Sequence, residues 1–261
     1  MEESIATVVI PIHREEPSEL EKVSLDQTLT VLSHFPITFM APTSLITGWY
    51  EEYCRDRAQI RFERFEWKGY EAYSMLMASN LFYKRFLNYN YILICHLDAF
   101  VFRDELEYWC GLNYDYIGSI MYNANWGTNS LFRRAIGFTI PEYFGNGGFA
   151  LKKVSSFYRI TLKHRLYITL FHFFRKLQKK SFYDDLFVTQ HFPKLSTDFR
   201  IPSKQVAQRF GAEYKKPAEG CPEEAPFVNP DKDSLPFGIH GWIQYHQDFW
   251  APYVRRYGYD I

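Results

Sequence analysis

The 261-residue sequence has few cysteines and no excess of either charge. Its cysteines lie far apart and show no C-x-x-C spacing, which argues against a zinc cluster or a disulfide framework; they are Cys54, Cys95, Cys110 and Cys221. Lysine plus arginine and aspartate plus glutamate both number 30, so no global positive field points to nucleic acid. We therefore expect a cytosolic protein with reduced thiols and no nucleic-acid partner.

Long hydrophobic runs and a secretory leader are also missing. No uninterrupted apolar stretch reaches the roughly 20 residues that a bilayer-spanning helix needs. Glu2 and Glu3 stand where a secretory signal would carry basic residues. The length suits one large domain or two small ones. Without an internal repeat or a clear linker, we expect a single domain over residues 1–261.

Aromatic residues, in contrast, are abundant. The chain has 24 Phe, 20 Tyr and 6 Trp, which together make 19% of its residues. Such side chains fill thick cores and also form surfaces on which sugars stack.

The first half of the sequence alternates strand-like and helix-like segments. Ser18 followed by Glu21 predicts a capping box at the start of one helix. The predicted order is strand Ile5–Ile12, helix Ser18–Ser33, strand Ile37–Met40, edge strand Gln59–Phe65, helix Tyr73–Leu87 and central strand Tyr91–Phe102. This order predicts an α/β fold with a mainly parallel sheet.

The second half is less regular. Its expected elements are strand Tyr114–Ile120, loop Asn123–Ser130, a glycine turn leading into a strand over Gly145–Leu151, helix Ser181–His191 and a surface loop over residues 211–236.

An acid, Asp98, interrupts the apolar run Tyr91–Phe102. A carboxylate inside such a run is costly unless a cation meets it, and ligands of open α/β sheets bind beyond the carboxyl ends of strands. Asp98 is thus either a ligand for a metal or a sugar nucleotide, or a cap of the next turn. On a continuous strand His96 would share its face. The alternative for His96 is a ring satisfied by a backbone carbonyl.

Three further groups are candidates for chemistry. The glycines of Gly145–Gly148 would let the backbone approach a ligand, or simply form a turn. Asp184 and Asp185 open a predicted helix, where the dipole favours acids, with Ser181 as a candidate cap. One of them could serve as a general base while the other caps or pairs. His240 could reach a phosphate or a metal, or be structural.

Residues 151–180 carry nine Lys or Arg and no acid, interleaved with apolar and aromatic residues. This pattern fits a solvated helix with one core-facing side. It also fits a helix that lies on an anionic membrane.

In combination these segments resemble a bacterial domain family of long-unassigned function that is regarded as glycosyltransferase-like. The family has an opening strand that ends in Ile-Pro, as at Pro11, and a Glu-Asp-like pair, as at Asp184-Asp185. The remaining matches are Tyr91–Phe102, Trp109-Cys110, Tyr114–Gly118, Gly145–Phe149 and Pro236–Trp242. His96 stands where this family usually has Gln, and Asp184 where Glu is usual.

The resemblance implies a GT-A-type nucleotide-sugar fold with a nucleotide-binding half at about residues 5–120 and an acceptor-binding half at about 121–261. It implies a glycosyltransferase that moves a sugar from a nucleoside diphosphate to a hydroxyl of a glycan or lipid-linked acceptor, with inversion, in bacterial surface polysaccharide synthesis (capsule or lipopolysaccharide). The expected location is the cytoplasm or the inner face of the membrane.

The resemblance also implies the roles of individual residues. Asp185 is the base, with Asp184 beside it. The nucleotide sugar contacts Pro11, Ser74, Asp98, Gly147 and Gly148. Asp98 and His240 hold Mn²⁺ or Mg²⁺. Phe100 stands where many GT-A proteins carry a second acid, which keeps open an inactive binding or assembly protein; a nucleotide-sugar hydrolase is a further alternative.

Overall fold

The computed structural model describes residues 4–122, 143–216 and 235–261. Its strands are β1 (Ala6–Pro11), β2 (Ile37–Pro42), β3 (Ile60–Phe65), β4 (Tyr91–Cys95), β5 (Phe100–Val101), β6 (Tyr116–Tyr122), β7 (Gly145–Lys153), β8 (Gly211–Tyr214) and β9 (Gly238–His240). Its helices are α1 (Glu19–Leu32), α2 (Gly48–Cys54), α3 (Gly69–Met77), α4 (Asn80–Lys84), α5 (Leu106–Gly111), α7 (Val154–Lys163), α8 (Arg165–Leu177), α9 (Asp184–Leu195), α10 (Lys204–Phe210), α11 (Trp242–Tyr245) and α12 (Gln247–Arg255).

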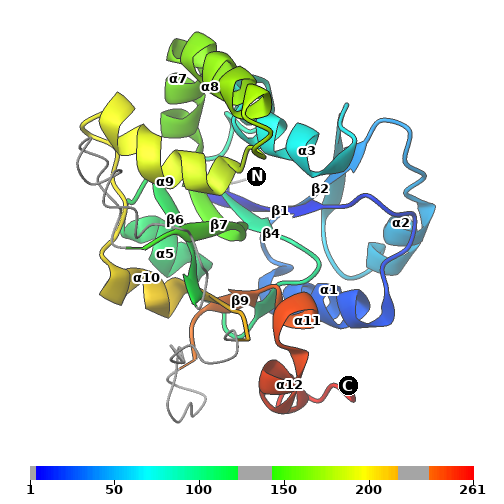
Figure 1. The fold of residues 1–261 in the computed structure, drawn as a ribbon. Coiled ribbons are helices and arrows are strands. Elements are labelled where there is room, and N and C mark those ends of the chain that lie inside the picture. Colours follow the sequence, from blue (N-terminus) through cyan, green and yellow to red (C-terminus); the bar gives the residue numbers. More distant parts are fainter. Residues whose placement is uncertain (1–3, 123–142, 217–234) are drawn as a thin grey trace.

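The described strands form one sheet in the order β3-β2-β1-β4-β7-β6-β8-β9-β5. Strands β1 to β4 are mutually parallel, while β7 runs antiparallel between β4 and β6. Helices α3, α7, α8 and α9 cover one face and α1, α5 and α10 the other (Figure 1). The predicted α/β class with a mainly parallel sheet is confirmed.

The first half follows the sequence pattern closely. Helix α1 begins after Ser18, whose side chain and that of Glu21 form the predicted capping box. β3 lies at one edge of the sheet, as its alternating charges indicated. The predicted helix Tyr73–Leu87 is instead two short helices, because Ser79 leaves the helical conformation and its hydroxyl caps α4.

The segment Tyr91–Phe102 is not one strand, which corrects the prediction. β4 stops at Cys95, and a turn follows in which the Ala99 amide donates to the His96 carbonyl at 2.9 Å. The chain then enters β5, which pairs with β9 at the opposite edge of the sheet. Phe100 is fully buried against Trp242. It therefore fills the core.

Two other predictions need correction. Residues Gly145–Gly148 lie within β7 rather than in a turn. Residues 211–214, expected in a surface loop, form the buried strand β8. The loop Asn123–Ser130 and the rest of the 211–236 segment from 217 to 234 lie outside the described residues.

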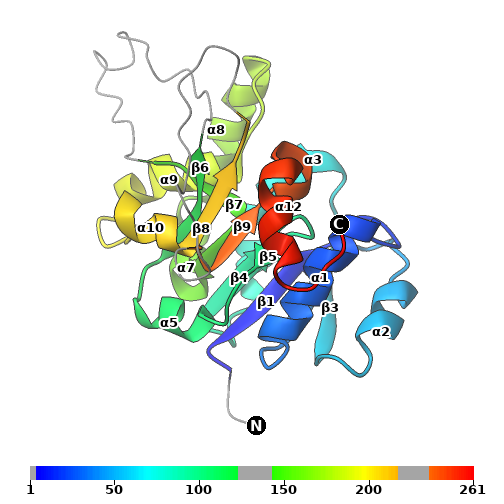
Figure 2. The ribbon, with the colours of Figure 1, turned by 90° about the horizontal axis from the view of Figure 1, so that it is seen from below.

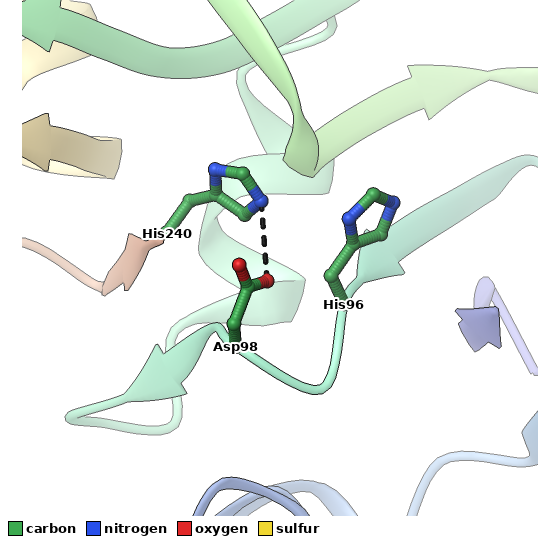
Figure 3. Close-up of side chains that lie close together, drawn as sticks. All are labelled: His96, Asp98 and His240. Atoms are coloured by element: carbon green, nitrogen blue, oxygen red, sulfur yellow. Dashed lines mark ion pairs between the residues drawn. The ribbon is translucent and has the colours of Figure 1, made fainter. Parts of the chain in front are cut away.

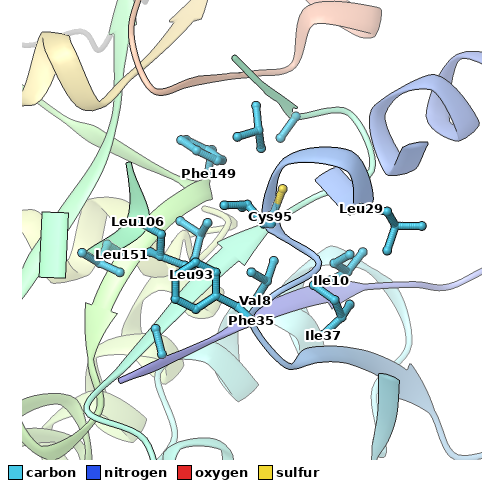
Figure 4. Packing of buried hydrophobic residues seen from close by; sticks show 14 of the residues in the cluster. Val8, Ile10, Leu29, Phe35, Ile37, Leu93, Cys95, Leu106, Phe149 and Leu151 are labelled. Carbon is cyan, nitrogen blue, oxygen red and sulfur yellow. The ribbon is translucent and has the colours of Figure 1, made fainter. Parts of the chain in front are cut away.

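The core lies on both faces of the sheet. Side chains of β1, β2 and β4, such as Val8, Ile37 and Leu93, pack with Leu29 of α1 and with Leu151 of β7 (Figure 4). Cys54, Cys95 and Cys110 are buried free thiols, consistent with packing as small hydrophobes. Cys221 is not described.

The carboxyl-terminal segment returns to the first half of the chain. The Trp242 indole donates to Ser24 of α1 at 2.9 Å, and α12 lies beside α1 (Figure 2). This return brings β9, and with it His240, to the end of β4. Within the described ranges, the helices are too short or too polar to span a bilayer.

Candidate active site

The turn after β4 presents His96 and Asp98 at the carboxyl end of a central parallel strand. The His96 amide donates to the Gly148 carbonyl at 2.8 Å, and its Nε2 lies 2.8 Å from the Tyr73 hydroxyl. Asp98 is mostly buried, with 24% of its side chain exposed. The two residues lie on a turn rather than on a strand face, yet both side chains point to the same place (Figure 3).

His240, at the end of β9, completes this cluster. Its Nδ1 lies 2.7 Å from a carboxylate oxygen of the fully buried Glu213, and its Nε2 lies 3.3 Å from Oδ1 of Asp98. Among the described residues, Nε2 has no hydrogen-bond partner. Glu213 thus fixes the ring so that Nε2 faces Asp98, which is how carboxylates orient metal-binding histidines.

The charges of the cluster depend on one another. Burial alone would lower the pKa of His240, but Asp98 and Glu213 raise it to about 10. Burial would raise the pKa of Asp98, but the His240 charge outweighs it and holds that pKa well below its usual value. Burial and the His240 charge lower the pKa of His96 to about 3. The site therefore stabilises a cation between two carboxylates and keeps His96 neutral.

This donor set suits a divalent metal ion. One ligand atom each from His96, Asp98 and His240 lies within 4.8 Å of the others. An imidazole binds a metal in its neutral form, so a divalent ion would displace the proton that His240 holds between Asp98 and Glu213. Mg²⁺ and Mn²⁺ often take their remaining ligands from substrate phosphates. His240 Nε2, buried and without a hydrogen bond among the described residues, is the atom that a metal would use.

A second acidic group lies at the start of α9. Asp184 and Asp185 are both nearly fully buried. Asp184 pairs with the buried Lys152 at 3.5 Å. Asp185 accepts from the Gly147 and Leu186 amides at 3.2 and 2.7 Å. The cap residue of α9 is Tyr183 and not Ser181. One acid pairs with a cation while the other remains uncompensated.

The pKa of both acids is raised. For Asp185 burial is the main cause and the adjacent Asp184 charge the next, and together they raise its pKa to about 7. For Asp184 burial raises the pKa against the opposing effect of Lys152. A carboxyl group with a pKa near neutrality can exchange a proton under physiological conditions.

Two tyrosines connect the acidic pair to the cluster of His96, Asp98 and His240. After burial, the charges that raise the pKa of Tyr73 include those of Asp184, Asp185 and Asp98. Burial also has the largest effect on the pKa of Tyr245. The charges of Glu213, Asp98 and Asp185 raise that pKa further. Each hydroxyl therefore lies within electrostatic reach of both groups. On β7, Gly148 lies against His240 and the adjacent Gly147 lies against Asp185, so the two groups are near each other.

The sequence matches the family described as a protein of unknown function, DUF5672, over residues 58–240. The chain belongs to DUF5672. No curated protein matches its sequence.

Solved structures similar to this DUF5672 chain are glycosyltransferases. The apo form of mouse xyloside xylosyltransferase 1 superposes with a TM-score of 0.57 at 12% identity, over 91% of this chain and 98% of that one. The apo form of glycosyltransferase GlyE from Streptococcus pneumoniae TIGR4 gives a TM-score of 0.51 at 14% identity, over 96% of this chain and 60% of that one. At such identities the likeness shows the fold, which is the predicted GT-A type.

The other predicted contact residues of the DUF5672 chain lie at the same end of the sheet or near it. β1 and β4 are parallel with Val9 opposite Ile94, so Pro11 ends level with His96. Gly147 and Gly148 lie on β7 next to Asp185 and His240. Ser74 is fully buried on α3, where its hydroxyl lies beside Asp184. Their contacts with a nucleotide sugar remain predictions.

Sequence reasoning missed Glu213, Lys152 and the tyrosines. Glu213 fell in a segment assigned to a surface loop because of its neighbouring Pro, Glu and Gly residues. Lys152 lay in the basic segment, whose charges suggested solvent. The pattern Gly211–Tyr214, with two small residues and a tyrosine around one acid, was the available signal for a buried strand.

The glycines of β7 lead to a test of the cluster. A Cβ on Gly148 would lie 2.0 Å from His240 Nε2, whereas a Cβ on Gly147 would meet Asp185 at an ordinary 3.4 Å. We expect Gly148→Ala to displace His240 and to abolish the thermal stabilisation by Mn²⁺ in differential scanning fluorimetry. Gly147→Ala is the matched control and should keep it. Equal responses from both variants would contradict the assignment of His240.

Proposed function

We propose that this protein is a glycosyltransferase that transfers a sugar from a nucleoside diphosphate donor to an acceptor hydroxyl. The observation that carries the proposal is the cluster of His96, Asp98 and His240 at the end of β4, with Glu213 behind His240 and with Asp185 nearby, against the neighbouring Gly147 of β7. The GT-A fold supports this proposal, because ligands of open α/β sheets bind beyond the strand ends.

In this proposal His96, Asp98 and His240 hold Mn²⁺ or Mg²⁺. When bound, the metal would supply positive charge to offset the charge of the departing diphosphate. Glu213 orients His240, and the Tyr73 hydroxyl orients His96 through its Nε2. Without a Cβ, Gly148 leaves room for the His240 ring, and Gly147 lies beside Asp185.

Asp185 takes the proton of the acceptor hydroxyl. The acceptor oxygen then forms a bond to the anomeric carbon while the bond from that carbon to the diphosphate breaks. The nucleoside diphosphate leaves with the electron pair, so a single displacement inverts the configuration. A pKa of about 7 allows Asp185 to be ionised before the step and protonated after it.

The acceptor side of the proposed site has an exposed aromatic pair. Tyr70 and Tyr183 lie with ring centroids 5.5 Å apart, and both rings are substantially exposed. Tyr183 directly precedes Asp184. Burial, followed by the charges of Asp185 and Asp184, raises the pKa of Tyr70 well above its usual value, so its hydroxyl stays protonated and can donate to a sugar.

We propose a glycan or lipid-linked acceptor of bacterial surface polysaccharide synthesis, with residues 5–120 holding the donor and residues 121–261 the acceptor. Synthesis of such a polymer from nucleotide sugars would take place in the cytoplasm. The exposed Tyr183 ring of the second half, which packs beside Tyr70, is the feature that favours a sugar acceptor.

A screen of donors tests the proposal. Thermal unfolding is followed with UDP-, GDP- and dTDP-sugars, each with and without Mn²⁺, and with a CMP-sugar as a control that has no diphosphate. At a concentration about 100 times its Kd, the true donor should raise the Tm by about 5 °C. The shift should require Mn²⁺.

Product analysis then separates the enzyme from the alternatives. A glycosyltransferase is expected to release free sugar slowly from the donor alone and to transfer the sugar faster when an acceptor is present. It should show no turnover without metal. Rapid hydrolysis that needs no acceptor would identify a hydrolase. Binding without any turnover would identify an inactive binding protein, and no donor binding at all would refute the proposal.

A further inference from the structure

Helix α8 exposes an apolar stripe along its outer side. The stripe consists of residues at positions i, i+4, i+7, i+8 and i+11, which share one helix face; they are Leu166, Leu170, Phe173, Phe174 and Leu177. Their exposed fractions lie between 45% and 68%. Five large apolar side chains in one exposed row are more than the scattered single residues that a soluble surface normally shows.

The opposite side of α8 holds the helix on the protein. Ile168 is buried there, and Phe171 packs on Phe187 of α9 with ring centroids 4.9 Å apart. His172 Nε2 lies 2.7 Å from a Glu71 carboxylate oxygen of α3. The core-facing side that the sequence predicted for this helix is therefore present. The exposed stripe is a second apolar side, and the core does not use it.

The charges around the stripe indicate what would cover it. By helical periodicity, Arg165 and Lys176 border the stripe on one side, and Lys179 and Lys180 follow its end; all four are exposed. Residues 151–180 contain nine basic residues and no acid. A second copy of the chain on this face would bring like charges together, whereas an anionic surface would attract them.

We propose that α8 binds an anionic membrane surface, lying in the plane of the interface with its apolar stripe among the lipid head groups. Its exposed phenylalanines and leucines supply buried apolar area, and its lysines and arginines supply attraction to acidic lipids. The inference does not depend on the transfer reaction. Binding through α8 would hold the buried acids of α9 close to the membrane surface, because only residues 178–183 separate the two helices.

Vesicle co-sedimentation tests this inference with the full chain. The probes are phosphatidylcholine vesicles with and without phosphatidylglycerol, at low and high salt. Apparent affinity for the anionic vesicles should exceed that for the neutral ones by at least about tenfold and should fall as salt screens the charges. Equal sedimentation with both vesicle types, or none with either, would overturn the inference without reference to any mutant.

Two pairs of variants assign the binding to α8. Phe173→Glu/Phe174→Glu should reduce sedimentation with anionic vesicles to the neutral level, while Ile46→Glu/Tyr108→Glu, equally exposed positions elsewhere, should not. Lys176→Glu/Lys179→Glu should also lose binding, and Arg209→Glu/Arg256→Glu is its charge-matched control. Circular dichroism confirms folding of each variant. If the phenylalanine variant instead turns a dimer into a monomer on size exclusion, the stripe is a self-association surface and the inference is wrong.

Discussion

Replacing Asp98 by asparagine is expected to lower sugar transfer by about 10²- to 10³-fold and to remove the metal dependence of donor binding. Asp98 supplies the only carboxylate among His96, Asp98 and His240, the cluster that would hold the metal. Asparagine keeps the shape of the side chain but not its charge. The loss should therefore appear in affinity for Mn²⁺ and for the donor diphosphate.

Isothermal titration with Mn²⁺ and the donor, together with initial transfer rates, checks this expectation. Asp104→Asn is the control, because Asp104 is an exposed carboxylate six residues further along the chain. It should behave as the wild type. If Asp98→Asn retains metal-dependent donor binding and full turnover, the diphosphate does not meet the carboxylate of Asp98.

Replacing Asp185 by asparagine is expected to reduce transfer by about 10²- to 10⁴-fold while donor binding is nearly unchanged. The wild-type rate should rise with pH and level off above about 7, because the base must be ionised and its pKa is raised to about 7. Asparagine cannot accept the proton, so the residual rate of the variant should lack this rise. Initial rates across the pH range and donor titrations measure both effects.

The same substitution has a stability signature of known sign. The pKa of Asp185 is about 7 in the folded protein, above its usual value of 3.8, so the folded state holds the proton more tightly between these two pH values. The protonated Asp185 therefore contributes to folding stability at pH values below 3.8, and this contribution is lost as the pH rises to about 7. The Tm of Asp185→Asn relative to wild type should therefore increase from about pH 5 to about pH 8.

Asp184→Asn is the matched comparison. It leaves the buried Lys152 without its carboxylate, and an uncompensated buried charge is destabilising. We expect this variant to unfold at a lower temperature at all pH values near neutrality. Wild-type transfer by Asp185→Asn, or a rate that does not change through pH 7, would contradict its role as the base.

Local signals in the sequence were sufficient for most of the first half. The apolar run of β1 and the capping box of Ser18 and Glu21 depend on residues close in sequence, and both are present. The break after Cys95 was not predictable in this way. Phe100 and Val101 have the same strand character as the residues of β4, and only their pairing with β9 separates them.

The candidate site shows the same division. Asp98, Asp185 and His240 could be singled out from residue type and neighbours. Glu213 could not, because its importance comes from the 2.7 Å contact with His240, which is 27 residues away in sequence. The turn expected at Gly148 was wrong: this glycine lies within a strand, where its missing Cβ leaves room for the His240 ring.

The most direct test of the account is a crystal grown with Mn²⁺ and the nucleoside diphosphate found in the screen. An anomalous map collected near the manganese edge locates the ion. The account predicts a peak bound by His96, Asp98 and His240 and in contact with the diphosphate. A diphosphate bound elsewhere, or a manganese ion that none of these three side chains contacts, would contradict it.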